Sequence, residues 1–269
     1  MTGSLLQTIA AHKRLEVAVS KAMISPAAMR ERARRAPEAR DFAGALRSAT
    51  ARPHGTPALI AEIKRASPAA GRLRNGLEPA NLARQYVAGG ARAISVLTDA
   101  RFFGARAEDL PAARAAVPVP VLRKDFILEP YQIYESRALG ADAVLLITAL
   151  LDGSALRSLM ALCGDLGMAA LVEVHTEAEA AAALEAGAHL IGINNRDLRT
   201  FAVDLDATQR LRSAIPAGIL VVSESGIHGS ADLARLRPFV DAVLVGTALV
   251  RSPDPAGAVR ALLNGGMTS

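Results

Sequence analysis

Eight short apolar runs recur between residues 58 and 245, and this repetition limits the folds open to the chain. Each run is apolar on both faces, as expected of strands in a parallel sheet that helices cover on its outside. Several of the intervening segments have helical patterning, namely Pro79–Ala88, Glu129–Leu139, Ser154–Leu166, Thr176–Ala186 and Ser230–Leu236. The predicted strands are Ala58–Ile63, Ala93–Leu97, Val119–Leu122, Ala143–Ile147, Ala169–Val174, Leu190–Ile193, Ile219–Val222 and Ala242–Val245.

Glycines mark the ends of several predicted helices, just before the next strand. The matching phrases are Gly89-Gly90-Ala91, Leu139-Gly140-Ala141 and Ala186-Gly187-Ala188. A glycine there suits the left-handed cap that turns a helix back into a parallel strand. Eight such units over roughly 210 residues predict an α/β fold, a (β/α)₈ TIM barrel. An open doubly wound sheet is the alternative, but no G-x-G-x-x-G turn follows the first strand.

Residues 1–50 differ from the rest, and we expect them to form an N-terminal helical extension of a barrel domain at 51–269, in a single domain overall. Leu5, Leu6, Ile9 and Ala10 recur at helical spacing. Ser25-Pro26 has the pattern of a helix N-cap followed by proline. The basic run 30–35 has no interleaved aromatic residues, which favours a solvated helix face over a nucleic-acid site.

The composition restricts the setting in which the chain works. The formal net charge of +5 fits either nucleic-acid binding or an enzyme of anionic metabolites. The single cysteine, Cys163, excludes an intrachain disulfide and favours a reducing compartment. The sequence has neither the pattern of a leader nor an apolar run of the roughly 20 residues that span a bilayer. We therefore expect a cytoplasmic protein without membrane contact.

Polar residues stand where six of the apolar runs stop. In a TIM barrel the chemistry lies at the carboxyl ends of the strands. Alternation places Lys124 on the face of Leu122, Glu173 on that of Leu171 and Glu224 on that of Val222. Taken alone, Glu62 and Lys64 fit a strand-end ion pair as well as a site. Together two lysines, three glutamates and an asparagine converge on one mouth: Lys64, Lys124, Glu62, Glu173, Glu224 and Asn194.

The residue types at this mouth indicate acid–base chemistry. The five histidines show no metal-ligand spacing, and no Ser–His–Asp arrangement is evident. A buried lysine can act as an acid or form a Schiff base, and a glutamate on another strand can act as the base. The turns Ser225-Gly226 and Gly246-Thr247 lie where such barrels bind phosphate. We expect a metal-free enzyme acting on a phosphorylated small molecule.

Over nearly its whole length the chain resembles the indole-3-glycerol phosphate synthase family. The phrases that carry the resemblance are Ala61–Pro68 (AEIKRASP), Leu122–Ile127 (LRKDFI), Tyr131–Glu135 (YQIYE), Leu171–Val174 (LVEV), Gly192–Leu198 (GINNRDL) and Ser223–Ile227 (SESGI). The segment Arg40-Asp41-Phe42 is similar to the helical extension of this family. The resemblance implies ring closure, decarboxylation and dehydration of 1-(2-carboxyphenylamino)-1-deoxyribulose 5-phosphate in tryptophan biosynthesis.

The resemblance also implies a role for each matching residue. Lys124 would be the general acid at the ketone, and Glu173 would handle the proton of the hydroxyl that leaves. Lys64 would hold the substrate carboxylate or phosphate, with a second proton donation as an open alternative. Glu62 and Glu224 would tune the lysines, and Asn194 and Arg196 would orient polar groups. Further substrate contacts would come from Ser67, Pro68 and Ser225, phosphate contacts from Gly226, Gly246 and Thr247, and ring contacts from Phe126, Leu145 and Leu244, for which ordinary barrel core is the alternative.

Three departures from the family pattern bear on loops and affinity. Ala69-Ala70-Gly71 replaces Ser-Lys-Gly, Gly104-Ala105-Arg106 follows the aromatic pair, and Thr247 stands where many members have Glu or Ser. They leave room for a paralogue that serves a secondary pathway.

The resemblance implies no cofactor, no metal, no nucleic acid, and a monomer that could associate with other tryptophan-pathway enzymes. Phosphoribosylanthranilate isomerase, a related barrel, would need a Cys–Asp pair at strand ends, whereas Cys163 falls in a predicted helix. A catalytically silent basic barrel would explain the charge but not the convergent Lys and Glu residues.

Overall fold

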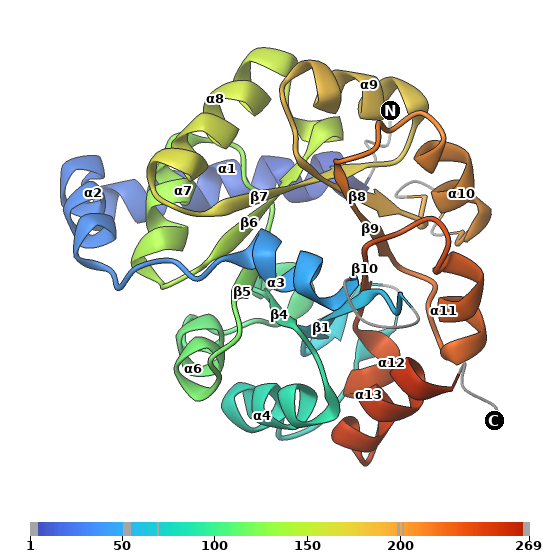
Figure 1. The fold of residues 1–269 in the computed structure, drawn as a ribbon. Helices are drawn as coiled ribbons and strands as arrows, with labels where there is room; N and C mark the ends of the chain where they lie inside the picture. Colours follow the sequence, from blue (N-terminus) through green and yellow to red (C-terminus); the bar gives the residue numbers. More distant parts are fainter. Residues whose placement is uncertain (1–4, 51–54, 69, 198–199, 201, 266–269) are drawn as a thin grey trace.

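Eight strands close into a parallel barrel at the centre of the molecule (Figure 1). The computed structural model describes residues 5–50, 55–68, 70–197, 200 and 202–265. Each strand pairs with its neighbours along the chain, and the first strand pairs with the last, which completes the predicted (β/α)₈ barrel. The strands are β1 Ala58–Ile63, β4 Ala93–Leu97, β5 Val121–Lys124, β6 Ala143–Ile147, β7 Ala169–Val174, β8 Leu190–Asn194, β9 Leu220–Glu224 and β10 Ala242–Val245.

Helices surround the barrel and precede it. The three of the extension are α1 Leu5–Met23, α2 Pro26–Arg35 and α3 Phe42–Thr50. The predicted glycine caps at Gly90, Gly140 and Gly187 are confirmed, since all three have positive φ angles. The other helices are α4 Pro79–Gly89, α5 Ala100–Phe103, α6 Asp109–Ala116, α7 Pro130–Ala138, the 3₁₀ turn η1 Thr148–Leu150, α8 Gly153–Asp165, α9 Glu177–Glu185, α10 Asp206–Arg212, α11 Ser230–Leu236, α12 Thr247–Val250 and α13 Pro255–Asn264.

The structure differs most from the sequence prediction at β5 and just after β1, and β9 is Leu220–Glu224 rather than the predicted Ile219–Val222. The strand predicted at Val119–Leu122 lies instead at Val121–Lys124. Pro118 and Pro120 lack the N–H group that a ladder needs, so regular pairing begins only after them. An unpredicted antiparallel hairpin, β2 Ala66–Ser67 with β3 Gly71–Arg72, follows β1.

Side chains that alternate along the strands build two separate apolar cores. One core lies between the barrel and its helices and contains residues such as Leu59, Val121 and Val172. The other fills the barrel interior and includes Ile60, Leu122, Leu145, Leu171, Val222 and Leu244. The predicted parity of Leu122, Leu171 and Val222 is thereby confirmed.

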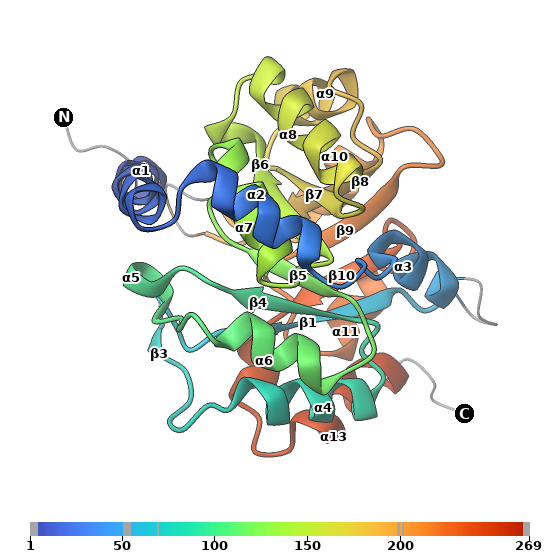
Figure 2. The ribbon, with the colours of Figure 1, turned by 90° about the vertical axis from the view of Figure 1, so that its left-hand side faces the viewer.

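The extension contacts both ends of the barrel. In Figure 2, α1 lies at one end and α3 at the other. Phe42 and Leu46 of α3 are buried within the interior core, so α3 closes the end where the strands begin. Arg40 fixes this arrangement, because its backbone N–H donates to Asp142 at 2.9 Å and its guanidinium donates to the carbonyl of Val119 at 2.8 Å.

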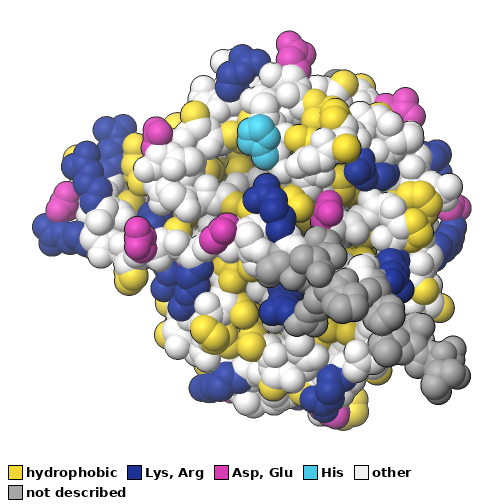
Figure 3. All heavy atoms as spheres, viewed as in Figure 1, with side chains coloured by type: hydrophobic (Ala, Val, Ile, Leu, Met, Phe, Trp, Pro, Cys, Tyr) yellow, Lys and Arg dark blue, Asp and Glu magenta, His cyan; other side chains and the backbone are white. Residues whose placement is uncertain are grey.

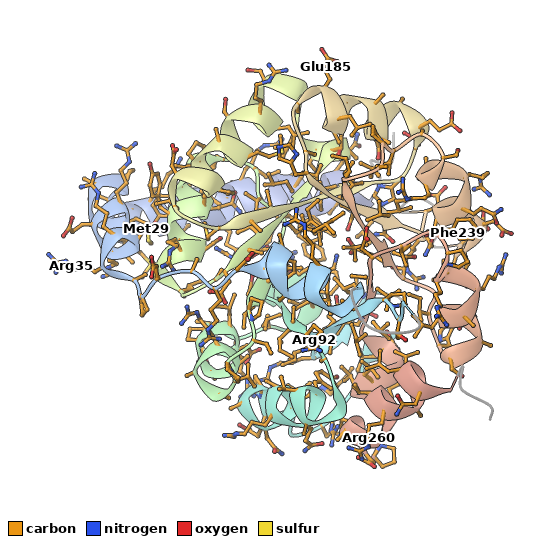
Figure 4. The ribbon with its side chains drawn as sticks, viewed as in Figure 1. Met29, Arg35, Arg92, Glu185, Phe239 and Arg260 are labelled. Atoms are coloured by element: carbon orange, nitrogen blue, oxygen red, sulfur yellow. The ribbon has the colours of Figure 1, made fainter. Side chains whose placement is uncertain are left out.

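The second helix packs against the outside of the barrel. Its predicted cap is confirmed, since Ser25 Oγ accepts from the N–H of Ala28 at 3.3 Å. Met29 is buried beside Tyr131 of α7, whereas Arg35 lies at the outer edge (Figure 4). On the face in Figure 3 the Lys and Arg side chains lie in separate groups. Among the described helices, none combines the length and apolar character needed to cross a membrane.

Candidate active site

Five polar side chains point inward just above the interior core, at the carboxyl end of the barrel. Each stands two residues beyond an inward-facing position of its own strand, as strand alternation requires. All five are buried or nearly so, which makes their partners decisive for their charge states. They are Glu62 of β1, Lys124 of β5, Glu173 of β7, Asn194 of β8 and Glu224 of β9.

Lys124 lies between two carboxylates that come from two later strands, β7 and β9. Its Nζ donates to Glu224 Oε2 at 2.9 Å and to Glu173 Oε2 at 3.3 Å. The two glutamate side chains are 3% exposed or less, and that of Lys124 is 16% exposed, so only the ammonium can readily meet a ligand. This arrangement provides a charged proton donor with two adjacent carboxylates.

The surrounding groups shift the pKa values of Glu224 and Glu173 in opposite directions. Burial raises the pKa of Glu224 to about 7, and Glu173 and Glu62 add to this against the attraction of Lys124. Burial acts in the same sense on Glu173, but Lys124, His175 and Asn194 lower its pKa below the ordinary value. Burial acts to lower the pKa of Lys124, and the surrounding carboxylates raise it above its ordinary value. Two carboxylates with divergent pKa values around one lysine are typical of acid–base assignments in active sites.

Glu62 and Lys64 form an ion pair that also faces the site. Lys64 Nζ lies 2.6 Å from Glu62 Oε1, and the Lys64 side chain is 17% exposed. Both side chains line the cavity described below. The predicted ion pair is therefore confirmed, and its position on the cavity leaves the role of both residues in a site as a prediction.

Two glycines, Gly246 and Gly192, leave the space that the Glu62 and Glu224 carboxylates occupy. A Cβ atom at Gly246 would lie 2.2 Å from Glu62 Oε1 and 3.1 Å from Lys64 Nζ. A Cβ at Gly192 would likewise lie 2.2 Å from Glu224 Oε1. Each carboxylate thus rests on the backbone of a neighbouring strand, in the space that a side chain would otherwise fill.

The polar cluster opens into a cavity of about 260 Å³ over strands β1, β9 and β10. A smaller recess of about 90 Å³ adjoins it, shares Lys124 and Asn194, and has walls of Leu97, Phe126, Leu145 and Ile147. Every site residue predicted from the sequence lines either the cavity or the recess. The cavity is lined by Glu62, Lys64, Ser67, Pro68, Lys124, Asn194, Arg196, Glu224, Ser225, Gly226, Leu244, Gly246 and Thr247, and the recess adds Glu173, Phe126 and Leu145.

The turn after β9 has an unusual backbone. Ser225 has φ of 67° and Gly226 has φ of 80°, so two consecutive residues are left-handed. Such a conformation is strained for serine and needs outside support. Asn195 supplies it by donating to the Ser225 carbonyl at 3.1 Å, while it also donates to Ser223 Oγ at 2.9 Å and accepts from Thr208.

His175 is a neighbour of the site that the sequence analysis missed. Its Nε2 lies 3.5 Å from Glu173 Oε1, on the side of that carboxylate away from Lys124. The signal was available, because His175 follows Glu173 by two residues and therefore shares its face.

A buried charge cluster behind β4 and β5 was also missed. Lys13 of α1 lies 2.9 Å from both Asp99 Oδ2 and Asp125 Oδ1, and its side chain is 2% exposed. Asp125 also accepts from Thr98 Oγ1 at 2.6 Å and contacts Arg123 at 3.0 Å. Burial acts to raise the pKa of Asp125, but Arg123 and Lys13 bring it down to about 2.

Two of the three departures from the family pattern lie beside the cavity. Ala70 and Thr247 line it, while Ala69 is outside the described residues. In the third, Ala105 is buried and Arg106 is exposed on another face, although the adjacent Phe103 reaches the cavity. Within the described part of the chain, no group of three His, Cys, Asp or Glu residues is arranged to hold a metal ion.

The family model and the sequence relatives point to one family. The family model for indole-3-glycerol phosphate synthase matches residues 6–262. The indole-3-glycerol phosphate synthase of Roseiflexus castenholzii is 50% identical over 268 residues, covering 96% of this chain and 98% of that protein. The protein of the same name from Mycolicibacterium gilvum is 49% identical over 266 residues, covering 98% and 96%.

A solved structure with a similar fold is the thiamine phosphate pyrophosphorylase of Pyrococcus furiosus. It aligns with a TM-score of 0.58 and covers 76% of this chain and 93% of its own, at 18% identity. At that identity the likeness concerns the barrel alone.

Proposed function

Because the chain belongs to the indole-3-glycerol phosphate synthase family, we propose that it closes the indole ring of 1-(2-carboxyphenylamino)-1-deoxyribulose 5-phosphate with loss of carbon dioxide and water. The family assigns the chain to the carboxy-lyases, enzymes of tryptophan biosynthesis that act on a small phosphorylated substrate. We propose the reaction steps and the role of each residue from the geometry of the cavity.

One observation carries the proposal: Lys124 stands where the polar cavity meets the apolar recess, with a carboxylate on either side. A substrate with an aryl ring at one end and a phosphate at the other needs both environments. Its reacting ketone lies between these ends and would face Lys124. The recess walls Phe126 and Leu145 suit the ring, and Leu244 borders the same interior from β10.

The phosphate would bind across the turns after β9 and β10. Gly226, Gly246 and Thr247 line this part of the cavity. Ser225 and Gly226 both have positive φ angles, and turns with left-handed residues can gather successive N–H groups around an anion. Ser67 and Pro68 of the hairpin segment line the same cavity, and so does Arg196.

In the first step, the ring carbon that bears the carboxylate attacks the ketone while Lys124 protonates the ketone oxygen. Loss of carbon dioxide returns an electron pair to the ring. In the dehydration, the hydroxyl gains a second proton and leaves as water, while the adjacent methylene loses one. We assign these transfers to Glu173, whose ionised carboxylate accepts a proton by exchange with Lys124, gives it to the hydroxyl and then takes the methylene proton.

This scheme takes up one proton in each turnover, because two protons enter the water and one leaves the methylene carbon. The uptake matches the negative charge that disappears when the carboxylate becomes carbon dioxide. Glu62 and Glu224 would stabilise positive charge that develops on the anilino nitrogen. Lys64, already engaged by Glu62, would serve as a binding cation for the carboxylate or phosphate rather than as the principal acid.

The direct test is product formation by the purified chain. We expect an indole fluorescence signal when the protein is mixed with the carboxyphenylamino-deoxyribulose phosphate. Lys124→Ala should abolish most of it, whereas Lys21→Ala on the outside of α1 should not change it. No product from the wild type, or equal activity of Lys124→Ala and wild type, would refute the proposal. Strong, salt-sensitive binding to DNA or RNA would favour a nucleic-acid-binding barrel instead.

A further inference from the structure

Three ionisable side chains form a line that leads from the site to a second cavity. The line begins at Glu173, whose Oε1 lies 3.5 Å from His175 Nε2. On the other side of the ring, His175 Nδ1 lies 3.3 Å from Glu179 Oε2. The imidazole is thus held between two carboxylates, one in the site and one on helix α9.

The two oxygens of Glu173 face two different side chains. Oε2 accepts from Lys124 at 3.3 Å, and Oε1 faces His175. The Nε2 atom of His175 is buried and has no hydrogen-bond partner among the described residues, so its contact with Glu173 is one of charge at close range. Rotation of the Glu173 carboxylate is therefore restrained from both sides.

The charges that face His175 are mainly negative. Burial acts to lower the pKa of His175, but the hydrogen bond to Glu179 and the charges of Glu173, Glu179 and Glu224 raise it above the ordinary value. Lys124 lies beyond Glu173, with that carboxylate between the two cations. The remaining ionisable groups around the second cavity are Asp197, Asp204 and Arg210.

His175 borders a second cavity, of about 700 Å³, outside the site. It is lined by His175, Glu179 and Asn194, together with residues of α1 and of the segment before α10. Asn194 also lines the site, so His175 and Asn194 form part of the partition between the two spaces.

We propose that His175, oriented by Glu179, is a positioning residue that fixes the Glu173 carboxylate toward Lys124 and sets a positive charge beside it. The inference rests on the proposed function, in which Glu173 handles protons of the substrate. A cation on the far oxygen keeps Glu173 ionised down to lower pH, so the base is available over a wider range. Glu179 restrains the ring, since one of its oxygens also accepts from the His175 backbone N–H at 2.6 Å.

A purely structural role is the alternative. Thr176 caps α9 and Glu179 reaches back to the preceding backbone, as in a capping box, so these residues also fix the start of the helix. The two roles predict different pH behaviour. Loss of a cap lowers stability at every pH, whereas loss of the charge moves the acid limb of kcat/KM.

The first experiment measures kcat/KM against pH for three variants. His175→Gln should move the acid limb upward by about one pH unit or more, because a cation is lost beside Glu173. Glu179→Gln keeps an acceptor for the backbone N–H and should move the limb in the same direction by less. Glu177→Gln removes the same charge from the same exposed helix turn and should leave the limb in place. A uniform loss at every pH in His175→Gln, with no movement of the limb, would overturn the proposal.

The second experiment needs no turnover and so separates the two proposals. Titration of the His175 ring by NMR should give a lower midpoint in Glu173→Gln than in the wild type, because a facing carboxylate is lost. An active wild type whose His175 midpoint is unchanged by Glu173→Gln would refute the positioning role and leave the proposed function intact. A lowered midpoint in a protein that forms no indole product would support the contact and refute the proposed function.

Chemical complementation provides a third measurement. His175→Ala leaves a space that is continuous with the second cavity, through which imidazole can enter. Added imidazole should move the acid limb back toward its wild-type position. Pyrazole has the same ring size but does not become a cation in this range, and it should not. Equal rescue by both would show that filled space is sufficient, which would contradict the proposal.

Discussion

The ammonium of Lys13 lies 2.9 Å from a carboxylate oxygen of Asp125, so the first helix of the chain is joined by charge to the residue after Lys124. Asp125 also accepts from the backbone N–H of Phe126 at 2.8 Å. Through one buried ion pair, the helix α1 therefore supports Asp125 and Phe126, which both line the recess of the proposed site.

The first prediction concerns this ion pair. Lys13→Met should lower the free energy of unfolding by about 3–5 kcal/mol, because it leaves Asp99 buried without its cation and leaves Asp125 with Arg123 alone. Lys21→Met on the same helix removes a half-exposed pair with Glu129 and should cost less than about 1 kcal/mol. Urea denaturation of both variants measures the difference. Equal losses would show that the buried pair contributes nothing beyond a surface contact.

Lys124 is expected to control the chemical step. Lys124→Ala should lower kcat by about 10²–10⁴-fold, the usual contribution of a general acid. It should also lower the free energy of unfolding, because Glu173 and Glu224 stay buried after they lose their shared cation. Steady-state kinetics with circular dichroism checks both points. A loss that appears only in KM would assign Lys124 to binding instead.

Glu224 predicts a dependence of stability on pH. Its pKa in the folded chain is about 7, against 4.5 for the free group, so between these values the folded state holds the proton and the unfolded state does not. Stability from this group is therefore present at low pH and declines as the pH rises from about 4.5 to 7. Glu224→Gln lacks this decline and should gain about 3 kcal/mol relative to wild type across that window. Denaturation at several pH values measures it, and a constant difference would contradict the prediction.

Gly246 is expected to tolerate no side chain. Gly246→Ala places a methyl group against Glu62 and Lys64, so both side chains must shift from their positions on the cavity wall. We expect KM to rise between about tenfold and a hundredfold, since displacements near 1 Å have effects of this size. Gly153→Ala, at the open start of α8, is the matched control and should leave KM unchanged. Unaltered kinetics in Gly246→Ala would mean that Glu62 can rest elsewhere.

Local sequence patterns were sufficient for the barrel and for the inward side chains. Strand alternation alone placed Lys124, Glu173 and Glu224 on the interior face, because each follows an apolar inward residue by two positions. The same rule extended by one step reaches His175. The true start of β5 was also accessible, since Pro120 excludes an earlier ladder.

Long-range contacts were beyond the reach of such patterns. Lys13 and Asp125 are far apart in sequence, and nothing in the helical spacing of α1 distinguishes a buried lysine from an exposed one. The placement of Phe42 and Leu46 beneath the interior core likewise depends on how the extension folds back. Gly192 and Gly246 look like ordinary strand and turn glycines until the glutamates that rest on them are seen.

The pairing of β1 with β10 limits when the barrel can close during synthesis of the chain. During translation β1 emerges among the first elements, yet one of its edges has no partner until Ala242–Val245 have been synthesised. Asp125 and Asp142, which contact Lys13 and Arg40, are synthesised much earlier than β10, so the extension can dock onto a half-built sheet. The nascent chain must therefore carry an open strand edge through most of its synthesis, and ring closure of the barrel is among its last folding events.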